Sequence, residues 1–321
     1  MPGEILVAGD TLVDFLPNRP GEIADVDAFE PKFGGSAANV AIALERLGFP
    51  PLFWTRLGGD GFGDFLAGRL DETAISDRFV VRDPEAKTTL AFVSNDRDGE
   101  RRFDFYRADT ADTRMQAGTV PDEALADCSW VHLTGVTLSV EPSRTATLDL
   151  AERASAQGCT VSLDPNARPE MWDGPAEFER VLADALERVD VVKASTEDLE
   201  LAGFEADAPI DLAEAVTDRG PQTVFLTLGT EGALAYGTAE SPIPGRTRHE
   251  GYDVDAVDTT GAGDGFLAGA IASIVAGCTD PERVLATANG VGAVTTTRKG
   301  SVAALTGVGA VQSLAGSLPW E

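Results

Sequence analysis

The sequence predicts an α/β protein: a doubly wound, mostly parallel sheet with helices on both faces and a small antiparallel β lid. Two observations lead to this prediction. Short runs of β-branched and apolar residues alternate with helical patterns along the chain, which is the rhythm of a parallel sheet covered on both faces. Two further segments instead alternate apolar and polar residues, as antiparallel strands outside the main sheet do. The 321 residues are enough to bury a large core.

The elements of the main sheet follow one another in order. Its expected strands occupy residues 5–8, 52–57, 130–133, 160–163, 189–192 and 223–228. Its expected helices occupy residues 37–47, 146–156, 177–188 and 211–218, and a further apolar helix covers 266–275. Each strand run ends in polar residues or glycine, such as Gly9 and Asp10 after the first. Ligands of doubly wound sheets bind at the carboxyl ends of the strands, so a site is expected there.

The lid is predicted from residues 13–33 and 88–107. A hairpin signal, Asn-Asp-Arg-Asp-Gly at 95–99, separates two apolar runs of the second segment. A small sheet over the carboxyl ends of the main strands would exclude water during a transfer reaction. The sequence shows neither a repeat nor a flexible linker, so residues 1–321 are expected to form a single domain with the two lid segments inserted in it.

The charge balance narrows the setting. Acidic residues outnumber basic ones by 53 to 25, for a net charge of −28, which argues against nucleic acid as a partner. Concentrated salt screens the self-repulsion of such a surface, which favours a halophilic source. The three cysteines, Cys128, Cys159 and Cys278, have no metal-binding spacing and indicate a reducing compartment. No apolar run approaches the ~18 residues of a membrane span, so we expect a cytoplasmic protein without a membrane partner.

The most informative motif is Asp-Thr-Thr-Gly-Ala-Gly-Asp at residues 258–264, which leads into the apolar helix. Glycines allow a tight turn whose amides point one way, and the start of a helix favours a phosphate or a developing negative charge. A carboxylate beside such a site repels phosphate, so Asp264 makes chemical sense as a base for an attacking hydroxyl. The alternative is that Asp264 is a helix N-cap in a glycine-rich turn.

Other nucleotide motifs are absent from the sequence. It contains no Gly-x4-Gly-Lys-Ser/Thr loop, and no Gly-x-Gly-x-x-Gly in the strand and helix context of a dinucleotide fold. A Rossmann oxidoreductase is therefore disfavoured. The only histidines are His132, which lies in an apolar run typical of a core strand, and His249.

The glycine turn is one of several motifs that carry a family resemblance. Gly-Gly-Ser-Ala-Ala-Asn-Val-Ala at 34–41, followed by Leu-Glu-Arg-Leu-Gly at 44–48, resembles the amino-terminal signature of the PfkB, or ribokinase-like, carbohydrate kinases, and 258–264 resembles their carboxy-terminal signature. Residues 58–63, 227–232 and 298–301 match as well, so the resemblance spans nearly the whole chain. It implies a ribokinase-like fold and ATP-dependent transfer of the γ-phosphoryl group to a sugar hydroxyl.

The resemblance also implies roles for particular residues. Asp264 would be the catalytic base, and the amides of Gly261, Ala262 and Gly263 would hold the transferred phosphoryl group. The implied sugar ligands are Asp14, Gly34, Gly35 and Asn39, and the implied nucleotide contacts are Lys193, Ser195, Thr227, Gly229, Gly232 and Asn289. The alternatives are a plain turn at 34–35 and a polar helix face at Asn289.

The resemblance further implies ATP, Mg²⁺ and K⁺ as cofactors. The family often carries Asn-x-x-Glu near the metal, whereas this chain has Lys-Ala-Ser-Thr-Glu-Asp at 193–198, a form similar to that of fructokinase-like members. Asp198 would then reach magnesium through a water, or it is simply a first-turn acid favoured by the helix dipole. Asp258, Thr260 and Ser301 resemble the family's monovalent-cation site.

Three motifs bear on the substrate. Residues 9–17 resemble the opening of fructokinases, whereas 103–107 and 164–172 occur both in fructokinase-like and in 2-keto-3-deoxygluconate kinase-like proteins. Arg107 and Arg168 in these segments could grip a sugar-acid carboxylate or make structural contacts. We therefore expect fructose as the substrate, with 2-keto-3-deoxygluconate second and ribose or a nucleoside third. A non-catalytic sugar-binding or nucleotide-binding relative is the alternative class, and a homodimer formed through the lid is expected by analogy.

Overall fold

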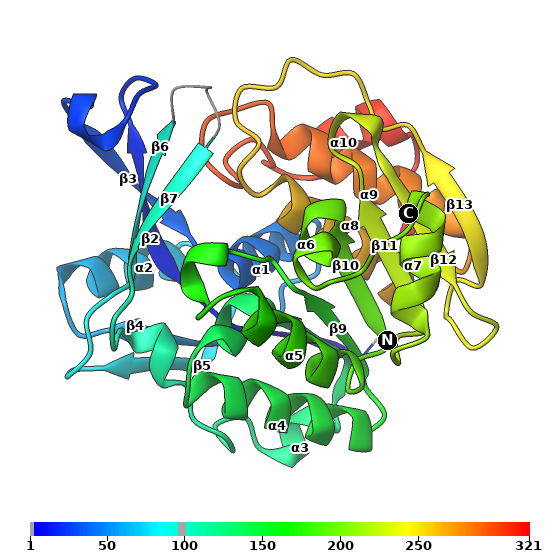
Figure 1. Cartoon of the computed structure of the whole chain (residues 1–321), viewed down its shortest axis with the longest axis horizontal. Helices are drawn as coiled ribbons and strands as arrows, with labels where there is room; N and C mark the ends of the chain where they lie inside the picture. Colours follow the sequence, from blue (N-terminus) through cyan, green and yellow to red (C-terminus); the bar gives the residue numbers. More distant parts are fainter. Residues whose placement is uncertain (1–2, 96–100) are drawn as a thin grey trace.

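The structure, a computed structural model, describes residues 3–95 and 101–321 and contains two sheets (Figure 1). The large sheet has the strand order β13 (Gly245–His249), β12 (Ala233–Gly237), β11 (Thr223–Thr227), β10 (Val191–Ser195), β9 (Thr160–Asp164), β8 (Cys128–Thr134), β1 (Glu4–Ala8), β4 (Leu52–Gly58) and β5 (Ser76–Asp83). The small sheet has the order β3 (Phe29–Gly34), β2 (Leu12–Pro17), β6 (Leu90–Asn95) and β7 (Arg101–Tyr106).

Helices lie between the strands, and three more follow the last strand, β13. They are α1 (Ser36–Arg46), α2 (Gly61–Asp71), α3 (Asp122–Leu125), α4 (Ser143–Ala156), α5 (Pro175–Leu186), α6 (Thr196–Leu201), α7 (Pro209–Thr217), α8 (Ala262–Val275), α9 (Pro281–Thr295) and α10 (Val308–Ala315). Short 3-10 helices are η1 (Ile23–Asp25), η2 (Ala111–Arg114), η3 (Gly135–Ser139), η4 (Pro169–Met171) and η5 (Gly229–Glu231). Among the helices of the described residues, none is long and apolar enough to cross a membrane.

The pairing of the large sheet confirms the predicted doubly wound architecture. Neighbouring strands are parallel from β11 across to β5, and β12 and β13 extend one edge in antiparallel fashion. The chain leaves β1 toward β4 and later returns to β8 on the other side of β1, so the strand order reverses there. The carboxyl ends of β1 and β8 are therefore where a ligand is expected.

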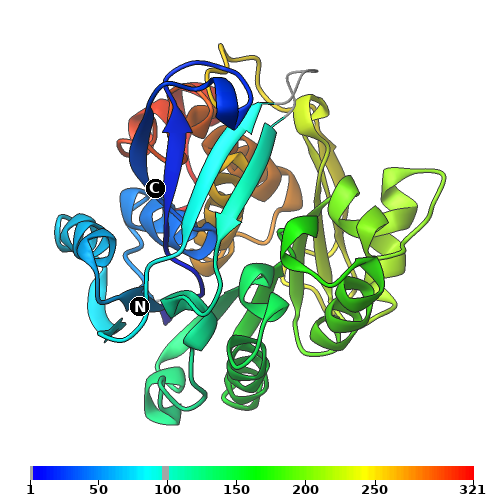
Figure 2. The same cartoon turned by 60° about the vertical axis from the view of Figure 1, so that its left-hand side comes forward.

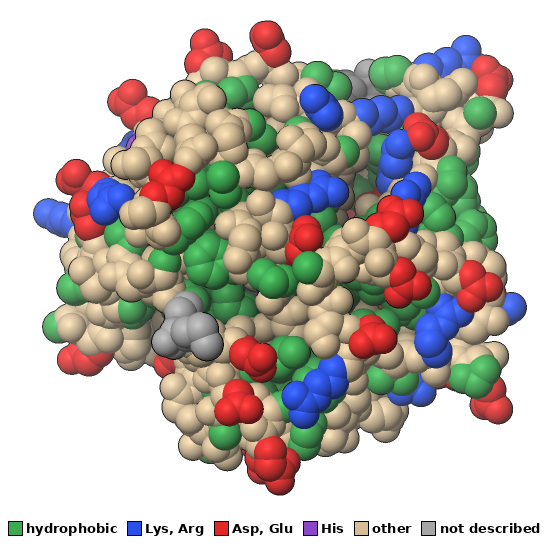
Figure 3. Space-filling view, turned by 180° about the vertical axis from the view of Figure 1, so that it is seen from behind, with side chains coloured by type: hydrophobic (Ala, Val, Ile, Leu, Met, Phe, Trp, Pro, Cys, Tyr) green, Lys and Arg blue, Asp and Glu red, His purple; other side chains and the backbone are tan. Residues whose placement is uncertain are grey.

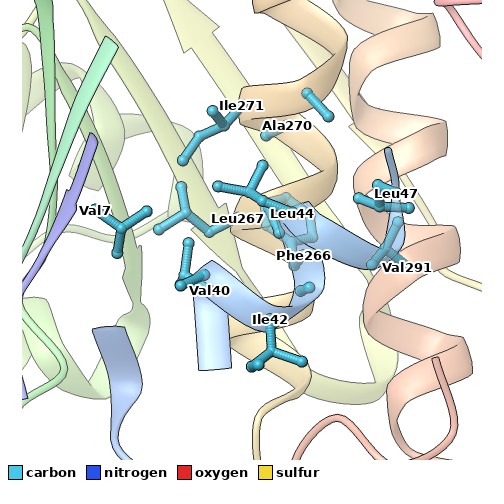
Figure 4. Close-up of a cluster of buried hydrophobic side chains, with 14 of the residues drawn as sticks. Val7, Val40, Ile42, Leu44, Leu47, Phe266, Leu267, Ala270, Ile271 and Val291 are labelled. Carbon is cyan, nitrogen blue, oxygen red and sulfur yellow. The ribbon is translucent and has the colours of Figure 1, made fainter. Parts of the chain in front are cut away.

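Each face of the large sheet carries its own core. Side chains alternate along a strand, so Val7 of β1 belongs to one cluster of buried residues and its neighbours Leu6 and Ala8 belong to the other. The first cluster includes α1, α8 and α9, and Figure 4 shows Leu44 beside Phe266 within it. The second cluster lies beneath α4, α5 and α7. These cores fix the start of α8 and the start of α1 relative to the strand ends.

The small sheet projects from the carboxyl ends of the large sheet's strands (Figure 2). As predicted, β2 pairs with β3 and β6 with β7 in antiparallel fashion. The central pairing, β2 with β6, is parallel, because these strands follow the parallel strands β1 and β5 and leave the large sheet in the same direction. The hairpin turn predicted at 95–99 lies almost wholly outside the described residues.

Candidate active site

A pocket of about 350 Å³ lies between the small sheet and the carboxyl ends of the large sheet's strands. The large sheet and α8 supply Asp10, Asp164, Lys193, Ser195, Thr227, Gly261, Gly263 and Asp264, and the small sheet supplies Leu12, Asp14, Phe103 and Phe105. The polar part of the wall is completed by Gly35, Ser36, Asn39, Asn166, Arg168, Asp198, Thr259 and Thr260. The pocket thus gathers residues from both halves of the chain at the place that the strand order predicts.

The glycine turn begins α8, and Gly261 is its N-cap with φ +76°. A Cβ at Gly261 would lie 2.6 Å from the carbonyl oxygen of Ser301, so both the conformation and the space require glycine. Gly261 and Gly263 line the pocket, whereas Ala262 is not part of the lining and its amide donates to the carbonyl of Thr259 at 3.2 Å. The first turn of α8 thereby presents an anion site to the pocket.

Asp264 lies in that first turn and is only 6% exposed. Its oxygens accept hydrogen bonds from Ser36 Oγ at 2.9 Å and from Asn39 Nδ2 at 2.8 Å. Both partners belong to α1, so the carboxylate joins the two helix starts and does not cap its own helix. Burial and the nearby Asp164 carboxylate raise the pKa of Asp264 to about 6, against the lowering effects of Asn39, Lys193 and Ser36.

Two further carboxylates stand beside the start of α1. Asp10 accepts hydrogen bonds from the amides of Ser36 at 2.9 Å and Ala37 at 3.4 Å, and burial followed by the Asp112 carboxylate raises its pKa. Asp14 is 7% exposed, and burial followed by the Asp10 carboxylate raises its pKa to about 7. The pocket wall on this side is therefore strongly acidic.

The glycines at 34 and 35 make room for these two acids. A Cβ at Gly34 would lie 2.1 Å from Asp14 Oδ2, so a larger residue at 34 would displace that carboxylate. Gly35 has φ +107°, and a Cβ there would lie 2.6 Å from the Asp10 carbonyl oxygen. Gly35 lines the pocket and Gly34 lies behind Asp14, so the two glycines contribute differently.

Lys193 is the buried cation of the pocket. Its Nζ lies 3.0 Å from Asp164 Oδ2, and a Cβ at Gly263 would come within 2.6 Å of the same Nζ. Burial lowers the pKa of Lys193, but the Asp164 and Asp198 carboxylates outweigh it, so the net shift is upward. The side chain therefore carries a positive charge next to the anion site of α8.

The Asp198 carboxylate accepts hydrogen bonds from two backbone amides. Its oxygens accept from Ser195 N and Ala167 N, both at 2.8 Å, and Ser195 Oγ accepts from Asp198 N at 3.2 Å to complete a capping box of α6. Asp198 still lines the pocket. Across the described residues, no group of three or more His, Cys, Asp or Glu side chains is arranged to hold a metal directly.

The two arginines that the sequence suggested for a carboxylate lie in different places. Arg107 is not part of the pocket lining, because Asp112 Oδ2 accepts from its Nε at 2.6 Å, and Ser139 Oγ and the Val136 carbonyl accept from its Nη atoms. Arg168 does line the pocket, with its guanidinium carbon 5.5 Å from the centre of the Phe103 ring of β7. The structure thus brings only Arg168 of the pair to the pocket.

The residues predicted to bind the nucleotide are partly brought together. Ser195 and Thr227 line the pocket at the ends of β10 and β11. Gly229, with φ +59°, follows β11, and no atom lies within 4 Å of where its Cβ would be, so its backbone faces open space. Gly232 packs against the His249 carbonyl, and Asn289 donates to the Leu285 carbonyl within α9 at 2.8 Å, so neither is part of the pocket lining.

Of the predicted cation residues, Asp258 and Ser301 are buried, whereas Thr260 is half-buried and lines the pocket. Asp258 Oδ1 accepts from Thr260 N and Oδ2 from Gly300 N, both at 2.9 Å. The Ser301 hydroxyl donates to Asn39 Oδ1 at 2.7 Å. The structure therefore holds the loop after α9 against the glycine turn.

Sequence reasoning missed several pocket residues. Asp164 ends β9, Asp10 lies two residues after β1, and Ser36 lies within the first signature, so position at or just beyond a strand end, or in the motif, was an available signal. Phe103 and Phe105 offered only strand alternation.

Comparisons with known proteins agree with this geometry. The sequence profile of the pfkB family carbohydrate kinases matches residues 3–306. The probable fructokinase-4 of Arabidopsis thaliana is 36% identical over 317 residues, which cover 97% of this chain and 96% of the relative. The ATP-bound fructokinase structure from Xylella fastidiosa superposes with a TM-score of 0.82 at 30% identity, covering 98% of both chains.

A double mutant of the fructokinase from Vibrio cholerae O395, solved with fructose, ADP and potassium ion, superposes with a TM-score of 0.84 at 29% identity and covers 98% of both chains. These similarities extend over both sheets, so they include the pocket and the small sheet above it. With a family profile that spans almost the whole sequence, the chain belongs to the pfkB family of carbohydrate kinases.

Proposed function

We propose that this carbohydrate kinase is an ATP-dependent fructokinase. The observation that carries the choice of a neutral sugar is the acidic wall formed by Asp10, Asp14 and Asp264, together with the burial of Arg107 against Asp112. A sugar acid on this wall would meet three carboxylates, and of the two lining cations Lys193 is already paired with Asp164, which leaves Arg168, whereas the hydroxyls of a ketose can donate to carboxylates. The similarity to fructokinases from plants and bacteria supports the same substrate.

In the proposed reaction, Asp264 accepts the proton of the attacking sugar hydroxyl. The hydroxyl oxygen forms a bond to the γ-phosphorus as the bond from that phosphorus to the β–γ bridging oxygen breaks, and ADP leaves with the electron pair. The amides of Gly261 and Gly263, which line the pocket, and the ammonium of Lys193 stabilise the charge on the transferred group, whereas the Ala262 amide is already bound to the Thr259 carbonyl. Thr227, Ser195 and the open backbone at Gly229 would receive the nucleotide.

The sugar would lie between the two sheets in the proposed complex. Asp14 accepts hydrogen bonds from its hydroxyls, and Asn39 offers the N–H that Asp264 does not use. Phe103 and Phe105 cover the sugar from the small sheet. We propose that this sheet acts as a lid within a single kinase domain and keeps water from intercepting the phosphoryl group.

The pH dependence of kcat/KM is a direct consequence of the proposed base. Because burial raises the pKa of Asp264 to about 6, the carboxyl is protonated below that pH and cannot accept the proton of the sugar. We expect kcat/KM to rise with pH through about 6, with ionisation of Asp14, whose pKa is about 7, extending the rise upward. A steady-state profile that stays flat through this range would contradict the assignment.

The substrate is tested by a coupled ADP-release screen in concentrated potassium chloride. Fructose, 2-keto-3-deoxygluconate, glucose, ribose and adenosine are compared by kcat/KM, and we expect fructose to be preferred. In addition, Arg168→Met should impair fructose phosphorylation modestly, since a neutral sugar leaves no buried anion unpaired. A preference for 2-keto-3-deoxygluconate that Arg168→Met abolishes would replace fructokinase with the sugar-acid kinase.

Magnesium and potassium complete the proposed chemistry. Magnesium neutralises charge on the phosphates of ATP. Asp198 would contact its hydration shell, in keeping with oxygens that already accept backbone amides. Asp258, Thr260 and Ser301 would place a monovalent cation behind the glycine turn. Equal turnover in potassium chloride and in an equally screening salt of a non-coordinating cation would count against the potassium site.

The setting of the enzyme follows from its surface. Asp and Glu side chains are spread across the face in Figure 3, in keeping with the net charge of −28 and with a salt-rich cytoplasm as the proposed location.

On the small sheet, Phe15 and Phe92 stack with ring centroids 4.7 Å apart, and Tyr106 is 65% exposed. We propose a homodimer through this face, and light scattering that returns a monomer mass would reject it.

A further inference from the structure

A buried chain of side chains reaches Asp264 from the loop after α9. Ser301 Oγ lies 2.7 Å from Asn39 Oδ1, and Asn39 Nδ2 lies 2.8 Å from Asp264 Oδ2. Ser301 is 5% exposed and Asn39 is 4% exposed, so water does not compete freely for these contacts. The three residues belong to the loop after α9, to α1 and to α8, and only the fold brings them together.

The hydrogen bonds from Ser301 through Asn39 to Asp264 run in one direction. An ionised carboxylate only accepts hydrogen bonds, so Asn39 must turn its N–H toward Asp264 and its carbonyl oxygen toward Ser301. The Ser301 hydroxyl must then donate. Rotation of the Asn39 amide by half a turn would place its oxygen against the carboxylate, which repels it, and the hydrogen bond that Ser301 donates stabilises the orientation with the N–H on the carboxylate.

The loop that carries Ser301 is itself held in place. The amide of Gly300 donates to Asp258 Oδ2 at 2.9 Å, and Lys299 Nζ donates to the Pro17 carbonyl oxygen at the end of β2 at 2.6 Å. The carbonyl of Ser301 lies against Gly261 of the glycine turn. The loop therefore contacts the small sheet, the anion site and the partner of the base at once.

We propose that Ser301 is a positioning residue for phosphoryl transfer, acting through Asn39 on the carboxylate of Asp264. Its hydroxyl orients the Asn39 amide, and that amide holds the carboxylate where the sugar hydroxyl arrives. This role rests on the proposed function, because it requires Asp264 to be the base.

The test compares kcat with KM in single and double variants. Ser301→Ala is expected to lower kcat roughly tenfold through misplacement of the base, with a smaller rise in the KM for fructose, which Asn39 also faces, and with the KM for ATP nearly unchanged. Asn39→Ala lowers kcat as well, and adding Ser301→Ala to it produces no further loss, since the two residues act in series. Ser301→Thr keeps the donor and most of the turnover.

The matched control is Ser273→Ala in α8. Ser273 is also buried, but its hydroxyl donates to the backbone carbonyl of Gly269, at 2.7 Å. This variant should keep wild-type kcat. Independent, multiplying losses from Ser301→Ala and Asn39→Ala would overturn the inference, as would wild-type kcat in Ser301→Ala. If Asp264→Asn is inactive at the same time, the proposed function survives that failure, whereas a wild-type protein that phosphorylates no sugar overturns both.

Discussion

Replacement of Asp264 by Asn is expected to lower kcat by roughly 10²-fold or more, the size of effect that loss of a general base produces. The change removes a proton acceptor and leaves the shape of the side chain almost intact. The hydrogen bonds from Ser36 and Asn39 show that the protein holds this carboxylate in one orientation beside the anion site. Coupled ADP release measures kcat, and calorimetry with fructose or ATP should show affinities close to those of the wild type.

The control for this substitution is Asp280→Asn. Asp280 is a true helix cap, since its side chain accepts from Glu282 N at the start of α9, and it lies on the surface. Its replacement should leave kcat unchanged. Near-normal turnover in Asp264→Asn would show that the carboxylate has no role in proton transfer.

Replacement of Arg107 by Met is expected to destabilise the protein by about 3–5 kcal/mol, because it leaves the Asp112 carboxylate buried without its partner. The Arg107 side chain is 9% exposed and that of Asp112 is fully buried. The hydroxyls of Thr89 and Thr110 also donate to Asp112 Oδ1, so the fold holds this carboxylate in its buried position. Urea denaturation of the two proteins measures the difference in free energy of unfolding.

Two further variants make the result interpretable. Arg107→Met combined with Asp112→Leu removes both charges and should recover part of the lost stability. Arg188→Met breaks surface pairs with Glu152 and Asp184 and should cost no more than about 1 kcal/mol. If Arg107→Met unfolds at the wild-type urea concentration and instead weakens sugar binding, Arg107 belongs to the pocket after all.

Local patterns in the sequence were sufficient for much of the fold. Alternation of apolar runs with helical periodicity predicted β1, β4, β8, β9 and β11, because these strands are buried by the helices that cover the two faces of the sheet. The glycine turn predicted the start of α8 because the required backbone conformation is nearly exclusive to glycine. The parallel pairing of β2 with β6 was not predictable in this way, since it depends on the directions of two distant strands.

In the site, too, local motifs predicted some residues, whereas contacts between distant residues could not be predicted. Motifs identified Asp264, Asn39 and Lys193, whose residue types already imply their chemistry. Periodicity could not reveal that Arg107 would be neutralised by Asp112, because Arg107 follows β7 and Asp112 lies in the 3-10 helix η2, and the sequence leaves the relative orientation of these two elements open. The contact between Ser301 and Asn39 joins residues 262 positions apart, a distance over which local preferences carry no information.

The small sheet is assembled from two hairpins that are far apart in the sequence, and this affects the order in which the protein folds. One hairpin follows β1 and the other follows β5, and the seam between them pairs Val13 with Leu90 and Phe15 with Phe92. Closing such a long loop costs entropy that is recovered only when the intervening strands and helices are in place. The seam should therefore form late during folding, and since Asp14 lies within it, the ability to bind sugar would be among the last properties that a refolding chain acquires.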